Sequence, residues 1–218
     1  MIPDNFYQGG WDRAYEHFGA HRDGEGWVFR LWAPQARRVC LAGDFNDWQG
    51  WDMTCLDGVW ELTVAHANVY DAYKYIVTGA DGQVRWKADP YAYHAQTRPE
   101  NGSKLYELPD YPWQDEAWMA HRREEPLGEG PLNIYEVHLG SWRRHENGET
   151  YSYRDSADAL ADYVKDMGFT AVELLPVAEY PLDDSWGYQC RRGHLCFEQQ
   201  VHHRTLCFSP KIRRPCVL

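Results

Sequence analysis

The chain has 218 residues, of which 44% are hydrophobic and 15% aromatic, enough for one large domain or two modest ones with a packed core. Its net charge of -11 argues against nucleic acid and anionic membranes as partners, because phosphate binding needs clustered lysine and arginine, but it leaves open a neutral polymer such as a sugar chain. No apolar run approaches the roughly 18 residues of a membrane helix, and the first ten residues do not look like a secretory signal, so we expect a cytoplasmic protein.

Residues 26–108 predict an antiparallel β-sandwich, preceded by an N-terminal extension over residues 1–25. Short segments with period-two apolar residues are separated by turns, which is typical of sandwich strands. The turn "ADG" at 80–82 predicts a hairpin between two of these segments. The segments read "WVFRLWAP", "RRVCLAG", "VWELTVA", "DAYKYIVTG" and "QVRWKA".

This region resembles the immunoglobulin-like, isoamylase N-terminal type of glucan-binding domain found in the alpha-amylase superfamily. The resemblance rests on "FRLWAP", "GDFNDW", "AYKYIV" and "KADPYA", in the family's order and spacing. It implies sugar contacts at Trp48, Lys74 and Trp86, which match the contact positions of the glycogen-binding module of the AMP-activated kinase beta subunit. An indole can stack on the apolar face of a pyranose, and an ammonium can bond its hydroxyls.

The competing interpretation is that these tryptophans are core residues, since aromatic side chains dominate sandwich interiors. We expect the tryptophans within strands to be core: Trp27, Trp32 and Trp60.

After a polar linker over residues 109–131, residues 132–189 predict one strand–helix–strand unit, the first part of a (β/α)8 barrel. The strands are expected over 133–142 and 171–177. The helix between them begins at a capping box of Ser152 and Asp155 and ends at Gly168. The predicted fold class is therefore a β-sandwich followed by an incomplete barrel.

The motifs "IYEVHLGSW", "YVKDMGFTAVELLPV" and "DDSWGYQ" resemble the opening of the catalytic barrel of 1,4-alpha-glucan (glycogen) branching enzymes. Those enzymes transfer α-1,4-glucan segments to form α-1,6 branches in glycogen biosynthesis, without a cofactor. The resemblance implies that Tyr188, with Trp186 beside it, lines a sugar subsite. The family's three catalytic carboxylates follow the fourth, fifth and seventh barrel strands, so no catalytic residue is expected here. Glu136 and Glu173 could pair, but a structural role is the simpler interpretation.

From residue 190 the composition changes. Residues 190–218 carry a net charge of +5 and no tryptophan, whereas the first 189 residues carry -16. The cysteine spacing is a weak match to zinc sites, so we expect no metal, and no motif supports nucleic-acid binding. A frameshift or truncation after Gln189 explains the change best. The four cysteines of this unrelated basic tail are Cys190, Cys196, Cys207 and Cys216.

The sequence therefore predicts the N-terminal portion of a branching enzyme, monomeric where folded, which binds α-1,4-glucan (glycogen or maltooligosaccharide) and does not catalyse branching. Two alternatives stay open: a stand-alone α-glucan-binding module, and a fragment of a malto-oligosyltrehalose trehalohydrolase, whose motifs are similar but looser.

Overall fold

The computed structural model describes residues 2–97, 99–107, 112–124, 130–177, 186 and 188. The chain divides into two compact units, with the boundary between residues 108 and 109, and each unit is described by itself. The predicted tail of residues 190–218, with its four cysteines, lies outside the described residues.

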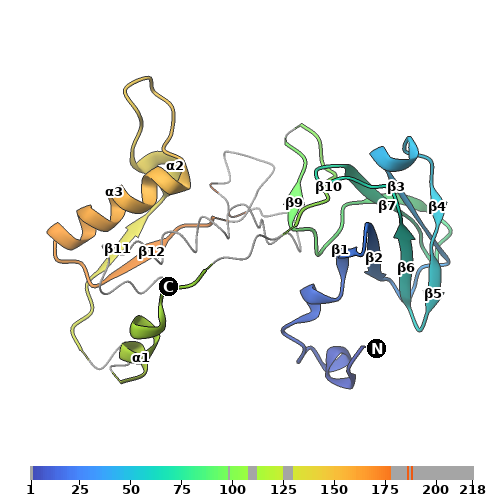
Figure 1. The fold of residues 1–218 in the computed structure, drawn as a ribbon, viewed down its shortest axis with the longest axis horizontal. Helices are drawn as coiled ribbons and strands as arrows, with labels where there is room; N and C mark the ends of the chain where they lie inside the picture. The colour runs from blue at the N-terminus through green and yellow to red at the C-terminus, as the bar shows by residue number, and fades with distance from the viewer. Residues whose placement is uncertain are drawn as a thin grey trace. The chain divides into compact units, whose positions relative to one another are not determined.

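The first unit is a β-sandwich of two antiparallel sheets (Figure 1). The first sheet contains, in order across it, β1 (Gly19–Asp23), β2 (Gly26–Trp32), β6 (Val59–Val64) and β5 (Thr54–Leu56). The second contains, in order, β4 (Trp51–Asp52), β3 (Arg38–Gly43), β7 (Ala72–Thr78), β10 (Ser103–Lys104) and β9 (His94–Ala95), with β8 (Val84–Lys87) also paired to β7. The β7–β8 pairing confirms the predicted hairpin at 80–82.

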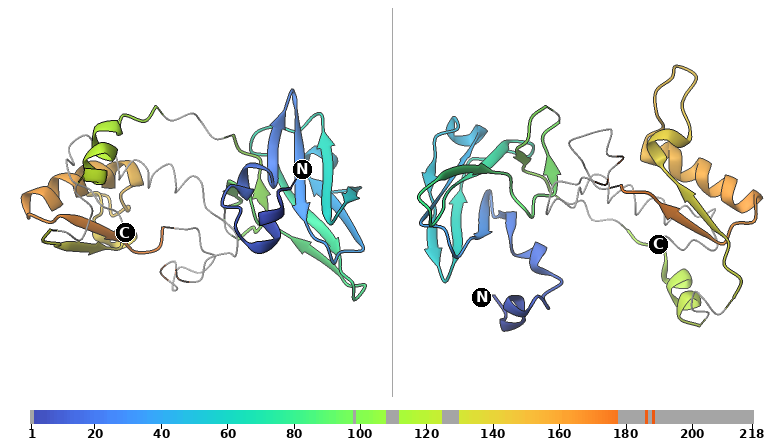
Figure 2. Two further views of the ribbon diagram at one scale, coloured as in Figure 1. Left: turned by 90° about the horizontal axis from the view of Figure 1, so that it is seen from below. Right: turned by 180° about the vertical axis from the view of Figure 1, so that it is seen from behind.

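The core lies between the two sheets. Figure 2 shows these sheets from two further sides. Alternation along each strand sends every second side chain inward. Trp27 and Trp60 are buried as predicted, and each indole N–H donates to a backbone carbonyl, that of Ala67 and that of Ala33. The prediction for Trp32 is wrong: the side chain is 41% exposed, because Leu31 takes the inward position next to it.

The sandwich begins before residue 26. Strand β1 lies in the predicted N-terminal extension, yet it pairs with β2 over its full length, from Gly19 opposite Arg30 to Asp23 opposite Gly26. Two short 3-10 helices precede it, η1 (Asp4–Gln8) and η2 (Ala14–Glu16). Only Gly19 and Ala20 of β1 are buried, so the strand lacks a long alternating apolar pattern.

The second unit contains a parallel strand pair joined through a helix. Strand β11 (Ile134–Val137) pairs in parallel with β12 (Ala171–Leu174), and α3 (Tyr153–Asp166) lies between them in the chain. The described part of this unit is a short mixed α/β stretch and not a closed barrel.

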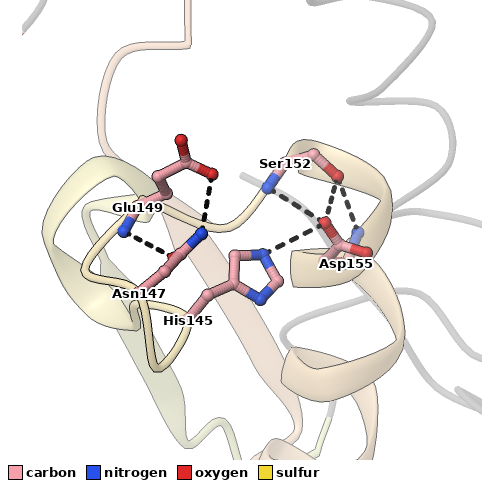
Figure 3. A network of polar contacts seen from close by, with 5 residues as sticks. All are labelled: His145, Asn147, Glu149, Ser152 and Asp155. Carbon is pink, nitrogen blue, oxygen red and sulfur yellow. Dashed lines mark hydrogen bonds and ion pairs between the residues drawn. The ribbon is translucent and has the colours of Figure 1, made fainter.

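Helix α3 begins at the predicted capping box, drawn in Figure 3. The Ser152 hydroxyl accepts from the Asp155 N–H at 3.2 Å, and the Asp155 carboxylate accepts from the Ser152 N–H at 3.3 Å. The apolar stripe of α3 is buried at Ala157, Leu160 and Val164, whereas Met167, which continues its spacing past the end of the helix, is 57% exposed. It packs on the face of β11 and β12 that carries Val137 and Val172.

Three features of the second unit differ from the prediction. The strand expected over 171–177 ends at Leu174. The strand expected over 133–142 ends at Val137, and a short helix, α2 (Leu139–Trp142), follows it. Val137 and Leu139 are both buried, so the apolar alternation of the strand continues into α2. The predicted linker contains a helix, α1 (Glu116–Glu124), which has no buried residue.

Candidate functional site

A candidate site lies on the outer face of the second sheet of the sandwich. On β7, Tyr73 and Tyr75 point into the core, so Lys74 and Ile76 point outward. Trp86 on β8 lies directly opposite Ile76, and residues opposite one another in an antiparallel pair share a face. The register of the hairpin therefore places Lys74 and Trp86 on the same outer surface.

Trp48 reaches this surface from the loop that follows β3. The loop turns through η3 (Asp44–Asn46), where the buried Asn46 amide accepts from the Gly43 N–H at 2.8 Å and donates to the Leu41 carbonyl at 3.0 Å. Asp47 and Trp48 then adopt positive φ angles of 52° and 58°, a left-handed turn that reverses the chain. In the motif "GDFNDW", Asn46 therefore stabilises the loop through its hydrogen bonds, and Asp47 begins the turn.

The Trp48 ring is fixed in place and lies next to Trp86. Its indole N–H donates to the Asp44 carboxylate at 2.9 Å. The centroids of the two indole rings are 6.3 Å apart with a tilt of 36°. Trp86 is 50% exposed and Trp48 is half-buried, so neither is a core residue. We call these two rings the tryptophan platform.

Lys74 lies on the same face and its ammonium donates to the side-chain amide oxygen of Asn101. Asn101 was not singled out from the sequence: it lies in an irregular segment before β10, and only the pairing of β10 with β7 brings it to Lys74. The structure thus brings together Trp48, Lys74 and Trp86, at which the resemblance implies sugar contacts, with Asn101 beside Lys74.

The other two predicted site residues belong to the second unit. Trp186 is 54% exposed, and its ring lies 5.1 Å from the ring of His138, the residue before α2. Tyr188 is 69% exposed. Both side chains are therefore accessible to a ligand.

Glu136 and Glu173 are register partners on β11 and β12. Both are exposed, on the face of the strand pair opposite α3. Among the residues that the structure describes, no group of three or more His, Cys, Asp or Glu is arranged to hold a metal ion. No helix in that part of the chain is long and apolar enough to cross a membrane.

Residues 17–92 match the family carbohydrate-binding module 48 (isoamylase N-terminal domain). Curated relatives include 1,4-alpha-glucan branching enzyme GlgB from Bacillus subtilis (strain 168), 41% identical over 192 residues, and that from Oleidesulfovibrio alaskensis, 47% identical over 190 residues. These alignments cover 84% and 82% of this chain, but 31% and 30% of the relatives. The chain thus spans about three tenths of the length of these relatives.

Among solved structures, a pullulanase from Bacillus acidopullulyticus matches with a TM-score of 0.62 over 92% of this chain and 28% of that one, at 21% identity. A pullulanase from Anoxybacillus sp. LM18-11, complexed with maltotriose, matches with a TM-score of 0.62 over 95% of this chain and 35% of that one, at 18% identity. At these identities the likeness concerns the fold.

Proposed function

This chain is homologous to the N-terminal portion of the 1,4-alpha-glucan branching enzymes GlgB, and we propose that its function is to bind an α-1,4-glucan chain on the outer face of its β-sandwich. The observation that carries this proposal is the pairing of Trp48 with Trp86 on an accessible surface beside Lys74. In this proposal the ligand is glycogen or a maltooligosaccharide.

The chemistry of the site suits a sugar. Two tilted indole rings 6.3 Å apart offer apolar surface to consecutive pyranose rings of a curved chain. Lys74 and Asn101 provide ammonium and amide donors and an amide acceptor for the sugar hydroxyls. Because the register of β7 and β8 sets the side of the sheet to which these groups belong, the surface is largely formed before the ligand binds.

We further propose that residues 132–189 are the first part of a (β/α)8 barrel, after a connecting segment over 109–131, and that Trp186 and Tyr188 line a sugar subsite of it. The parallel pairing of β11 with β12 through α3 supports this arrangement. Retaining transfer needs two carboxyl groups about 5–5.5 Å apart on either side of the scissile bond. We assign structural roles to Glu136 and Glu173, so the proposed activity of the described residues is binding without branching.

Affinity electrophoresis in gels containing glycogen tests the platform. We expect glycogen to retard the chain, and Trp86→Ala to raise the dissociation constant about fivefold, since one stacked aromatic contact is worth about 1 kcal/mol. Trp51→Ala is the matched control, because Trp51 is 44% exposed on the same sheet and contacts Phe45 rather than Trp86. Equal retardation of both variants and the parent chain would contradict the proposed site.

A second measurement separates binding from branching. Purified chain is incubated with amylose and the mixture is stained with iodine, whose absorption changes when branches are introduced. We expect retardation in the glycogen gel and an unchanged iodine spectrum. A spectrum that changes with time in proportion to added chain would assign catalysis to this sequence and refute the binding-only proposal.

A further inference from the structure

A second concave surface lies on the other sheet of the sandwich. A groove of about 790 Å³ runs over the outward side of β5 and β6. Trp60 and Val64 of β6 point into the core, so Glu61 and Thr63 between them point outward and line the groove. The tryptophan platform is on the outward side of the opposite sheet, so the two surfaces share no residue.

The N-terminal segment forms the other wall of this groove through Tyr7 and His17. An aromatic cluster holds the segment there: the ring of Phe6 packs edge-on against Trp32 at 5.1 Å and also contacts Phe18 at 5.1 Å. This contact gives a reason for the outward position of Trp32. The wall therefore packs on the sandwich, although it belongs to the segment predicted to be an N-terminal extension.

The lining of the groove alternates apolar and hydrogen-bonding groups. Tyr7 is 59% exposed and offers a ring face. Thr54 and Thr63 offer hydroxyl groups, and Asp57 and Glu61 offer carboxylates. Carboxylates and hydroxyls are hydrogen-bond acceptors for sugar hydroxyls, and a tyrosine ring can contact the apolar face of a pyranose.

Charge favours a neutral ligand. The Glu61 carboxylate accepts a hydrogen bond from Arg30, so its charge is balanced within the sandwich. Burial, and the nearby charge of Arg30, lower the pKa of His17, so its imidazole is neutral at pH 7 and can both donate and accept. Mixed donors and acceptors beside an exposed ring are suited to a polyhydroxylated chain rather than to an anion.

We propose that this groove is a second binding site for α-glucan, with Tyr7 as the stacking residue and Glu61 as a hydroxyl acceptor. The identity of the ligand rests on the proposed function of the platform, but the site itself is independent of it. Two sites on opposite faces can engage two branches of one glycogen particle. Binding to glycogen is then tighter than binding to a short oligosaccharide, because the second binding event is intramolecular.

Isothermal titration of the full chain with maltoheptaose tests this proposal. We expect two molecules bound per chain. Tyr7→Ala should weaken one of the two sites and leave the platform at its parent affinity, and Trp86→Ala should weaken the other and leave the groove at its parent affinity. Tyr70→Ala is the matched control, because Tyr70 is 53% exposed and does not line the groove, and it should still bind two.

Hydrogen exchange, compared with and without maltoheptaose for each variant, gives a second readout that locates the bound ligand. In Trp86→Ala, maltoheptaose should slow exchange of the amides in residues 54–63, while in Tyr7→Ala it should slow only the amides around β7 and β8. Glu61→Gln, which keeps the shape of the side chain, should weaken the groove site and leave the platform unchanged.

The failures are distinguishable. One molecule bound per chain, with no effect of Tyr7→Ala and no protection in residues 54–63, overturns the groove and leaves the proposed function intact. Two molecules bound, with the affinity of one site lowered in Tyr7→Ala but neither lowered in Trp86→Ala, supports the groove and overturns the platform. No binding of maltoheptaose by any of these chains overturns both.

Discussion

Asp89, in the motif "KADPYA", is a fully buried carboxyl group in the sandwich. It accepts hydrogen bonds from the Tyr73 hydroxyl at 2.7 Å, the Tyr75 hydroxyl at 3.1 Å and the Tyr91 N–H at 2.8 Å. Burial raises the pKa of Asp89 to about 6, against the opposing effect of these three donors. The motif that identified the family therefore includes a structural carboxyl group below the proposed glucan surface.

This pKa predicts a pH dependence of stability. Because the pKa of Asp89 is higher in the folded chain than in the unfolded chain, the folded state binds more protons between about pH 4 and pH 6. The stabilising effect of this proton is complete below about pH 4 and is lost as the pH rises through about 6. Relative to Asp89→Asn, which does not titrate, the parent chain should lose unfolding free energy over that range.

Urea unfolding followed by tryptophan fluorescence at several pH values measures the difference. A gap between the two chains that stays constant from pH 4 to pH 7 would mean that the carboxyl group does not change its protonation in this range. Tyr75→Phe, which removes one donor, should raise the pKa of Asp89 further and move the midpoint of the change upward.

Three tryptophans show what the sequence can and cannot predict for single residues. Trp32 was expected in the core, although the alternation of Trp27, Phe29 and Leu31 already assigns its position to the outer face. The strand alternation thus indicates an exposed Trp32, whereas the core prediction rests on the aromatic character of the residue alone. The pairing of Trp48 with Trp86 was not visible, because it depends on a left-handed turn at Asp47 and on the register of β7 with β8.

At the scale of elements, the start of α3 is fixed by side chains that Figure 3 shows. Besides the capping box, the His145 imidazole lies 3.6 Å from the Asp155 carboxylate, and Asn147 and Glu149 close the preceding turn. The hydrogen bond from Ser152 lowers the pKa of Asp155, with a smaller effect of His145, so this carboxylate is charged at neutral pH beside the helix N-terminus.

Ser152→Ala should therefore destabilise the start of α3 by about 1 kcal/mol, the usual cost of losing a cap side chain. Amide hydrogen exchange in the first turn should accelerate about fivefold in this variant. Ser152→Asn keeps a capping oxygen and should restore slow exchange. If both variants exchange alike, the cap oxygen contributes little and packing alone holds the helix end.

Elements with strong local signals were predictable, and those without were not. Helix α3 has a cap, an apolar stripe and a glycine stop in its own sequence, so its bounds follow from them. The end of β11 at Val137 was missed because Leu139 continues the alternation inside α2. Helix α1 was missed because none of its residues is buried, which removes the periodic signal.

At the scale of the whole chain, the two units differ in how much core each contains. Among the described residues, the sandwich core has thirteen buried residues from Ala20 to Leu105, most of them in the strands of the two sheets. In the described part of the second unit, the core around α3 has six, and it covers one face of a two-stranded sheet. Because stability grows with buried apolar area, the second unit by itself should be far less stable than the sandwich.

Hydrogen exchange of the full chain measures this difference directly. Amides of β2, β3 and β7 should be the slowest to exchange, and those of β11 and β12 at least about tenfold faster, since they open without unfolding the sandwich. Equal protection of both strand sets would mean that the units unfold together.

A chain of residues 1–108 contains every described residue of the platform and of the groove, and it tests whether the sandwich is independent of the second unit. It should then unfold at the same urea concentration as the sandwich in the full chain and be retarded equally by glycogen. A lower urea midpoint would mean that the second unit stabilises the sandwich, whereas weaker retardation at an unchanged midpoint would assign part of the binding surface to the second unit.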